Sequence, residues 1–306
     1  MRLDPQAQQV LELAANQPPI FTLSPDQARR RIQKALAAEP PGPEVALVRN
    51  LNAGGVPARL YHPSPAYAAP VLVYFHGGGW VINSVDTHDS VCRFIASHSG
   101  CCLISIEYRL APEHRYPAAF DDAWAATRWI YEHTGELNVD RSRFAVGGDS
   151  AGGALATAVA LRARDSRDLD IQFQLLIYPI TDYHTPARQS YVQYAEGYAL
   201  ESEGMKWFWG HYLPPGVDLN DRFLCPLRAP DLRHMPPAFV MTAEYDPLRD
   251  EGREYAARLR ASGVAVEESH YADKMHGFIR QYHRIDRARE ALLEISQKLA
   301  AALLVR

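Results

Sequence analysis

A serine between glycines is the residue of this sequence best suited to nucleophilic chemistry. Gly148-Asp-Ser-Ala-Gly152 fits the pattern Gly-x-Ser-x-Gly, after an apolar stretch that predicts a buried strand and before a run of strong helix formers. A serine in a tight strand–helix turn is a nucleophile elbow, in which a Cβ two residues before or after the serine would crowd the turn. Such five-residue matches also arise by chance in Gly/Ser-rich loops, but the flanking elements favour Ser150 as a nucleophile. We expect Asp149 to orient neighbouring loops.

A loop of glycines is suited to stabilise the negative charge that such a reaction develops. His76-Gly-Gly-Gly-Trp80 directly follows the apolar run 71–75. Consecutive glycines let backbone N–H groups approach a substrate oxygen without side chains in the way. The N–H of Ala151 points at the same place from the start of the helix after Ser150. We expect His76, which precedes the elbow, to orient this loop through hydrogen bonds and not to act as a base.

The base must come from the later part of the chain. In open α/β sheets with this elbow the order is serine, acid, histidine, each at the carboxyl end of a strand. His276 lies just past the last predicted strand. Five other histidines follow Ser150 but lie in an insertion, before or within the last strands, or before the C-terminal helix: His184, His211, His234, His270 and His283.

The acid that best fits the pattern is Asp246, which follows the predicted strand 239–243. Glu244 lies too close to the end of that strand, and Asp250 belongs to the first turn of the next predicted helix. An aspartate before a proline also suits a helix N-cap, so capping is the alternative role of Asp246.

Alternating strands and helices must position these residues. Short apolar runs, typical of strands covered on both faces, alternate with helical segments. The predicted strands are 45–51, 56–62, 71–75, 101–108, 144–147, 173–178, 239–243 and 264–271, the first two joined by a turn at 52–55. The predicted helices are 90–99, 121–133, 154–163, 249–262 and 284–304. This order predicts an α/β fold with a mostly parallel sheet wrapped by helices.

Two segments stand outside this alternation. Residues 1–43 contain two predicted helices, 5–15 and 26–38, the second capped by Ser24, and end in Pro40-Pro-Gly-Pro43. Residues 181–224 contain no obvious strand and many aromatic side chains. Either segment could simply pack at the periphery, and we favour a helical cap over a pocket. We therefore expect N-terminal cap helices at 1–43 and a catalytic domain at 44–306 with a cap insertion at about 181–224.

Composition and charge disfavour several classes of function. The net charge of −4 gives no electrostatic footprint for nucleic acid or an anionic membrane. No apolar run approaches the roughly 20 residues that span a bilayer, and the N-terminus lacks the apolar core of a signal peptide. The four cysteines lack zinc-site spacing, so we expect reduced thiols in a cytoplasmic protein.

Motifs for metals and nucleotides are missing from the sequence. It contains no His-Glu-x-x-His and no phosphate-binding glycine loop. His88-Asp89 is an isolated pair of ligand-type residues, which we interpret as a surface feature of a helix start. We therefore expect neither a metal nor another cofactor.

Four blocks together resemble the hormone-sensitive-lipase-like family of bacterial α/β-hydrolase carboxylesterases. They occur in the family's order, and the resemblance covers about residues 45–306. The blocks are His76-Gly-Gly-Gly-Trp80, Tyr108-Arg-Leu-Ala-Pro-Glu113, Gly148-Asp-Ser-Ala-Gly-Gly153, and Asp246-Pro-Leu-Arg-Asp-Glu-Gly252 with His276-Gly-Phe278.

The resemblance implies an eight-stranded sheet with an antiparallel second strand, and a cap built from the N-terminus and the insertion. It implies Ser150 as nucleophile, His276 as base and Asp246 as the residue that orients the histidine. It also implies an oxyanion-hole loop in which the first glycine shapes the loop and the other residues donate: Gly77, Gly78, Gly79 and Ala151. Members hydrolyse small-molecule esters of short- to medium-chain acids through an acyl-serine, without a metal.

The resemblance leaves alternatives for activity and assembly. Relatives that serve as non-catalytic ligand receptors have lost the catalytic histidine, whereas His276 is present here. Hydrolysis of amides, carbamates or longer-chain lipids would use the same three residues. Some members are dimers through the last strand, so either a monomer or a homodimer is expected.

Overall fold

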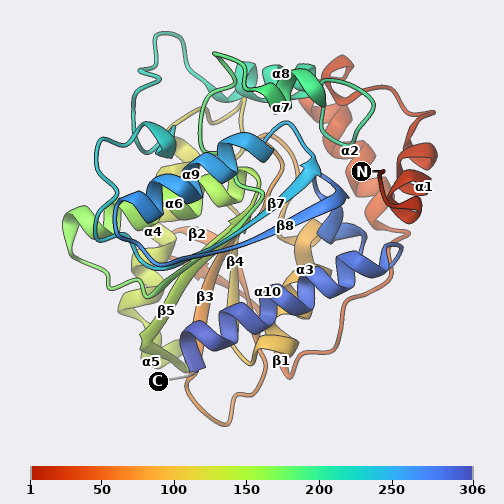
Figure 1. Ribbon diagram of the computed structural model, residues 1–306. Coiled ribbons are helices and arrows are strands. Elements are labelled where there is room, and N and C mark those ends of the chain that lie inside the picture. Colours follow the sequence, from red (N-terminus) through yellow and green to blue (C-terminus); the bar gives the residue numbers. More distant parts are fainter. Residues whose placement is uncertain (1, 305–306) are drawn as a thin grey trace.

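Eight strands form one sheet with the expected topology. The computed structural model describes residues 2–304 (Figure 1). The strand order is β1-β2-β4-β3-β5-β6-β7-β8. β2 is antiparallel to β1 and β4, and all other neighbours are parallel. The strands are β1 (Leu47–Ala53), β2 (Val56–His62), β3 (Ala69–Phe75), β4 (Cys102–Ile106), β5 (Val139–Asp149), β6 (Phe173–Ile177), β7 (Ala238–Tyr245) and β8 (Val266–Met275).

Helices cover both faces of the sheet (Figure 1). Along β3, Val71, Val73 and Phe75 join one core cluster and Leu72 and Tyr74 the other, because successive side chains of a strand point to opposite faces. Helices α4, α6 and α9 contribute to the first cluster, and α3 and α10 to the second. These helices and the short elements between them are α3 (Val85–Ser99), α4 (Ala118–Glu132), α5 (Thr134–Leu137), α6 (Ala151–Ser166), η2 (Pro226–Arg228), α9 (Arg249–Ala261), η3 (Phe278–Gln281) and α10 (Asp286–Leu304).

The boundaries of three elements differ from the prediction. β8 continues past residue 271 to Met275, which pairs with Tyr245 after a register irregularity in β7. The predicted hairpin between β1 and β2 is present, but its turn is confined to Gly54 and Gly55, whose φ angles are +66° and +98°. The helix after the elbow begins at Ala151, earlier than predicted, because the elbow turns directly into it.

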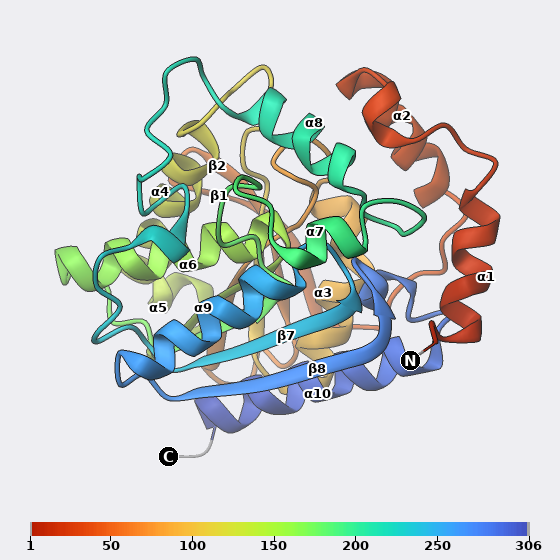
Figure 2. The same ribbon diagram turned by 45° about the horizontal axis from the view of Figure 1, so that its top comes forward.

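The N-terminal helices and the 181–224 segment lie together at one end of the sheet (Figure 2). The segment contains helices and no strand, as predicted. Ser24 and Gln27 form a capping box at the start of the second N-terminal helix. Trp207 Nε1 donates to the Leu23 carbonyl (3.1 Å), so the two segments touch. Their elements are α1 (Pro5–Ala14), η1 (Ile20–Thr22) and α2 (Pro25–Leu36), and α7 (Gln189–Gln193) and α8 (Ser202–Tyr212).

Arg29 of α2 fastens the N-terminal segment to the sheet domain. Its guanidinium donates to the carbonyls of Val81 (2.8 Å) and Ala111 (2.7 Å) and pairs with Glu113 at 2.8 Å. Lys274, next to the end of β8, pairs with Asp4 at the start of α1 (2.8 Å). The N-terminal segment thus contacts the loops that follow β3 and β4, and the last residues of β8.

Two further features bear on the expected location of the protein. Across residues 2–304, no helix combines the length and the apolar character that crossing a bilayer requires. The four cysteines are buried free thiols, as expected: Cys92, Cys101, Cys102 and Cys225.

Candidate active site

Ser150 occupies a strained turn between β5 and α6. Its φ of 55° and ψ of −119° are rare for a residue with a side chain. Its N–H donates to the Ile177 carbonyl (2.9 Å), which ties the turn to β6. The predicted crowding is present at Gly148, where a Cβ would lie 2.5 Å from the Gly152 carbonyl carbon. At Gly152 the crowding comes from β3 instead, because a Cβ there would lie 1.8 Å from the Phe75 oxygen. The turn therefore requires glycine at both positions.

Ser150, His276 and Asp246 meet where β5, β8 and β7 end. His276 Nε2 lies 3.0 Å from Ser150 Oγ, and His276 Nδ1 lies 2.6 Å from Asp246 Oδ2. Asp246 is fully buried, and its Oδ1 accepts the Leu248 N–H (2.8 Å), so a turn-capping contact exists beside the one to histidine. Because an ionised carboxylate only accepts, Nδ1 donates and Nε2 of the neutral ring accepts from the serine. This arrangement can remove the serine proton during attack.

The rival acids have other partners. Glu244 lies within β7, where it pairs with Arg249 and lies 2.9 Å from His270 Nε2. Asp250 lies in the first turn of α9 and pairs with Arg249 at 2.8 Å. Neither carboxylate contacts His276 in the described chain.

The glycine loop after β3 presents backbone N–H groups near the elbow. Gly77 N–H donates to Asp149 Oδ1 (2.9 Å), so this residue shapes the loop. The N–H groups of Gly78, Gly79 and Ala151 have no acceptor among residues 2–304. Gly78 and Gly79 adopt φ angles of +121° and +58°, which residues with a Cβ rarely adopt. Three unpaired N–H groups of this kind can stabilise an oxyanion.

His76 contacts the same glycine loop through a hydrogen bond and stacks on Tyr108. Its Nδ1 donates to the Gly77 carbonyl (2.8 Å), and its ring stacks on Tyr108 with 4.3 Å between centroids. The Tyr108 hydroxyl donates to the His76 carbonyl (2.7 Å). Burial and the neighbouring His88 lower the pKa of His76 to about 3, so the ring is neutral. These contacts hold His76 against the glycine loop, and its orienting role stays a prediction.

Asp149 connects the elbow to the glycine loop. Besides Gly77 N–H, its carboxylate accepts the Tyr74 hydroxyl (2.8 Å) and lies 3.3 Å from His88 Nε2. Burial opposes the ionisation of Asp149, but His88 and the hydrogen bond from Tyr74 outweigh it and lower the pKa of the carboxyl well below its usual value. The expectation that Asp149 orients neighbouring loops is confirmed.

The interpretation of His88-Asp89 as a surface feature is wrong for His88. The pair lies in the first turns of α3, but His88 is fully buried against the sheet and contacts Asp149. Tyr74 and His88 are supporting residues that the sequence did not indicate, because their partner lies more than 60 residues away. Neither His88 nor Asp89 belongs to a group of three possible metal ligands within residues 2–304.

A cavity of about 910 Å³ lies over Ser150 and His276. Its walls come from the glycine loop, from α1, η1 and α2, and from the 181–224 segment. Phe208 of α8 reaches the glycine loop so closely that a Cβ on Gly79 would lie 2.2 Å from its ring. Leu200 and Met205 add apolar side chains to the same wall. The cavity can accommodate an apolar group beside the serine.

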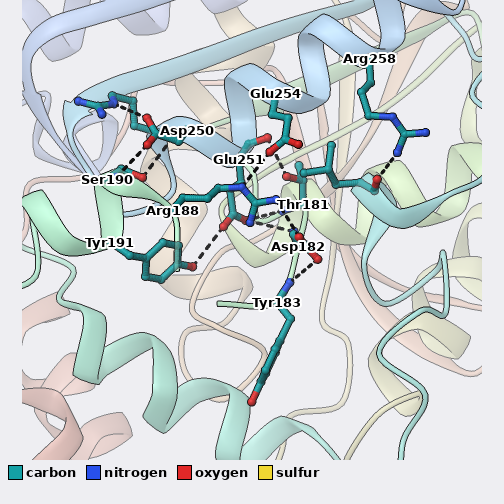
Figure 3. Close-up of polar contacts among 12 residues, drawn as sticks. Thr181, Asp182, Tyr183, Arg188, Ser190, Tyr191, Asp250, Glu251, Glu254 and Arg258 are labelled. Carbon is teal, nitrogen blue, oxygen red and sulfur yellow. Dashed lines mark hydrogen bonds and ion pairs between the residues drawn. The ribbon is translucent and has the colours of Figure 1, made fainter. Parts of the chain in front are cut away.

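Polar contacts hold the start of the 181–224 segment against α9 (Figure 3). Glu251 Oε1 accepts the N–H groups of Thr181 (2.7 Å) and Asp182 (3.2 Å). Its Oε2 lies 3.2 Å from the Tyr191 hydroxyl. Since α9 directly follows the loop of Asp246, this cluster joins the segment above the cavity to the loop that carries the acid.

Comparison with known proteins identifies the family. The profile of a family described as having the alpha/beta hydrolase fold matches residues 72–280, which is more than half of the chain. The chain belongs to the α/β-hydrolase family. The expected fold class and the expected membership of its hormone-sensitive-lipase-like carboxylesterase group are both confirmed.

Relatives of this α/β-hydrolase include named ester hydrolases. Carboxylesterase NlhH of Mycobacterium tuberculosis is 45% identical over 231 residues, 73% of this chain and 71% of the relative. Ethyl acetate hydrolase of Pseudomonas putida is 37% identical over 291 residues, 92% of this chain and 91% of the relative. The solved structure of the hyperthermophilic esterase from Pyrobaculum calidifontis superposes with a TM-score of 0.93 at 37% identity, covering 98% of this chain and 99% of that one.

Proposed function

We propose that this α/β-hydrolase is a serine carboxylesterase with Ser150 as nucleophile, His276 as general base and Asp246 as the residue that orients the histidine. The observation that carries the proposal is the pair of contacts from Ser150 Oγ to His276 (3.0 Å) and from His276 to Asp246 (2.6 Å), at the floor of a cavity. The ester-hydrolase relatives support the same reaction in this chain.

Acylation begins when Ser150 Oγ attacks the ester carbonyl carbon and His276 Nε2 takes its proton. The tetrahedral oxyanion accepts hydrogen bonds from the N–H groups of Gly78, Gly79 and Ala151. His276 then protonates the leaving alcohol, and an acyl-Ser150 remains.

Deacylation repeats these steps with water. His276 removes a proton from the water as it attacks the acyl carbon, and returns that proton to Ser150 Oγ when the acid leaves. Asp246 holds the Nδ1–H tautomer and stabilises the imidazolium in both halves of the reaction. Its complete burial keeps the carboxylate in place without competing water.

Segments 1–43 and 181–224 serve as a cap on the catalytic domain 44–306 and select short- to medium-chain acyl esters. The proposal is supported by the cavity wall, to which both segments contribute and in which Phe208 lies against the glycine loop. A series of p-nitrophenyl esters from acetate to palmitate tests this selection. A maximum of kcat/KM at long chains would contradict it.

A monomer or a homodimer and a cytoplasmic location stay predictions for this protein. The buried free cysteines support a reducing compartment. Light scattering after size-exclusion chromatography tests the oligomeric state, and cell fractionation tests the location.

Replacing the nucleophile tests the central assignment. Ser150→Ala should lower kcat for p-nitrophenyl butyrate by about 10⁴-fold or more, with unchanged circular dichroism. Ser142→Ala, an exposed serine earlier on the same strand, is the matched control and should retain activity. A fluorophosphonate should label the wild type and not Ser150→Ala. Retained hydrolysis by Ser150→Ala would overturn the proposal.

A further inference from the structure

The wall of the Ser150 cavity carries more positive than negative charge. Arg31, Lys34 and Arg280 line the cavity, together with the carboxylates of Asp149 and Glu201. Asp149 is already occupied by the three donors described above. Glu201 is thus the one remaining carboxylate of the described lining to balance three cations.

Arg280 is the cation of this wall that lies nearest in sequence to His276. It lies in η3, four residues after His276, and lines the cavity beside His276 and Gly277. Its Nε is buried and has no hydrogen-bond partner among residues 2–304. Several other arginines of this protein have carboxylate partners, such as Arg29 with Glu113. The terminal nitrogens of this guanidinium also have no hydrogen bond or ion pair among residues 2–304, so they can donate to an acceptor in the cavity.

The charge of Arg280 reaches the residues that hold the glycine loop and the elbow. In addition to burial and His88, it lowers the pKa of His76 beneath the glycine loop. It also acts on the buried Asp149 beside the nucleophile. Arg280 is thus within electrostatic reach of a substrate held at Ser150.

The two other cations extend the positive wall into the N-terminal cap. Arg31 donates to the Pro18 carbonyl, and burial lowers the pKa of its guanidinium. Lys34 lies one turn further along α2, and no carboxylate among residues 2–304 pairs with it. Both side chains can attract an anion that enters the cavity.

We propose that the cavity accepts esters that also carry a carboxylate, and that Arg280 recognises this group. The inference rests on the proposed esterase function and names a substrate class for the same site. The planar guanidinium matches a carboxylate through two parallel hydrogen bonds, and such charge-assisted bonds are stronger than neutral ones. Hydrolysis of such a half-ester adds water across the ester bond and releases the carboxylic acid and the alcohol, one of which keeps the second carboxylate.

A carboxamide is the informative comparison for this carboxylate. Asn83 also lines the cavity, and its buried Oδ1 has no donor within the described chain, while its Nδ2 donates to the Gly77 carbonyl. An amide can donate to Asn83 and accept from Arg280, whereas a carboxylate can only accept. The two groups have nearly the same shape and differ in charge.

Two matched substrate pairs separate charge from shape on either side of the ester. Monoethyl succinate against ethyl succinamate varies the acyl side, and 4-acetoxybenzoate against 4-acetoxybenzamide varies the alcohol side. The readout is the ratio of kcat/KM for the carboxylate over the carboxamide. Arg280→Met should lower this ratio by about tenfold in at least one pair, the loss expected for one hydrogen bond between charged groups. Arg280→Lys, which keeps the charge, should retain part of the ratio.

Arg284→Met is the matched control. It removes one charge from the same segment, but Arg284 is exposed and does not line the cavity. Its ratios should equal those of the wild type. Raising NaCl from about 0.05 to about 0.5 M should lower the wild-type ratio of the responsive pair, because salt screens the attraction.

Three results would overturn the inference. They are unchanged ratios in Arg280→Met for both pairs, an equal fall in Arg284→Met, or wild-type ratios that do not respond to salt. The last measurement needs no variant, so it decides even if Arg280→Met does not fold. If the wild type hydrolyses p-nitrophenyl butyrate but gives one of these three results, this inference alone is refuted. Retained activity in Ser150→Ala would refute the proposed function.

Discussion

The buried carboxyl of Glu251 makes the stability of this protein depend on pH in a predictable direction. Burial raises the pKa of Glu251 to about 8, from an ordinary value of 4.5. Between these two pH values the native state holds a proton that the unfolded state has released. Stability therefore falls as pH rises from about 4.5 to about 8, and is constant above that range with respect to this group.

Glu251→Gln is the perturbation that isolates this effect. The neutral amide keeps an acceptor for the N–H groups of Thr181 and Asp182 and can donate to the Tyr191 hydroxyl (Figure 3). By linkage, the wild type should lose about 2 to 3 kcal/mol of unfolding free energy between about pH 6 and about pH 9 that the variant keeps. For a chain of 306 residues this difference corresponds to about 4 °C in Tm.

Calorimetry or urea unfolding of both proteins at the two pH values measures this difference. Glu254→Gln is the matched control on the same helix, because its partly exposed carboxylate pairs with Arg188 at 2.9 Å. It should show the pH dependence of the wild type. Equal pH dependence in Glu251→Gln and the wild type would refute the reasoning, since Glu251 would then already be ionised at the lower pH.

Three further substitutions test the site. Gly79→Ala brings a Cβ within 2.2 Å of the Phe208 ring and should lower kcat/KM for p-nitrophenyl butyrate about 10²-fold; wild-type activity would contradict the oxyanion role. Asp149→Asn removes the charge that accepts the Gly77 N–H. It should lower both kcat and the free energy of unfolding measured with urea, the latter by about 1 to 3 kcal/mol. A change in neither quantity would contradict the orienting role of Asp149. Asp246→Asn should lower kcat about 10⁴-fold with little change in KM, because the amide favours the wrong histidine tautomer. An unchanged kcat would exclude Asp246 as the orienting residue.

Local sterics made much of the site predictable from the sequence. The motif of the elbow lies within five residues, and a Cβ on Gly148 would meet the backbone of Gly152. The crowding at Gly152 itself comes from Phe75 of β3, which the motif does not contain. Chain order selected Asp246 and His276, because parallel strands bring their carboxyl ends to one edge. The alternation of apolar strands and helices likewise predicted the sheet.

Residues that act through partners distant in sequence could not be predicted in this way. Gly77 and Asp149 are separated by 72 positions, and Thr181 and Glu251 by 70. The burial of His88 follows from how α3 packs on the sheet, which its spacing did not reveal.

The amino-acid sequence alone predicts Ser150 as nucleophile, the order of the proposed catalytic groups and the class of fold, because these follow from a local motif and from strand order. Which polar groups are paired and which are not depends on the folded arrangement of the chain. Asp149 is surrounded by donors, whereas Arg280 Nε lacks an acceptor in the described chain, although both line the same cavity. The physical reason is that hydrogen bonding depends on distances of about 3 Å between atoms, which packing sets after the chain has folded.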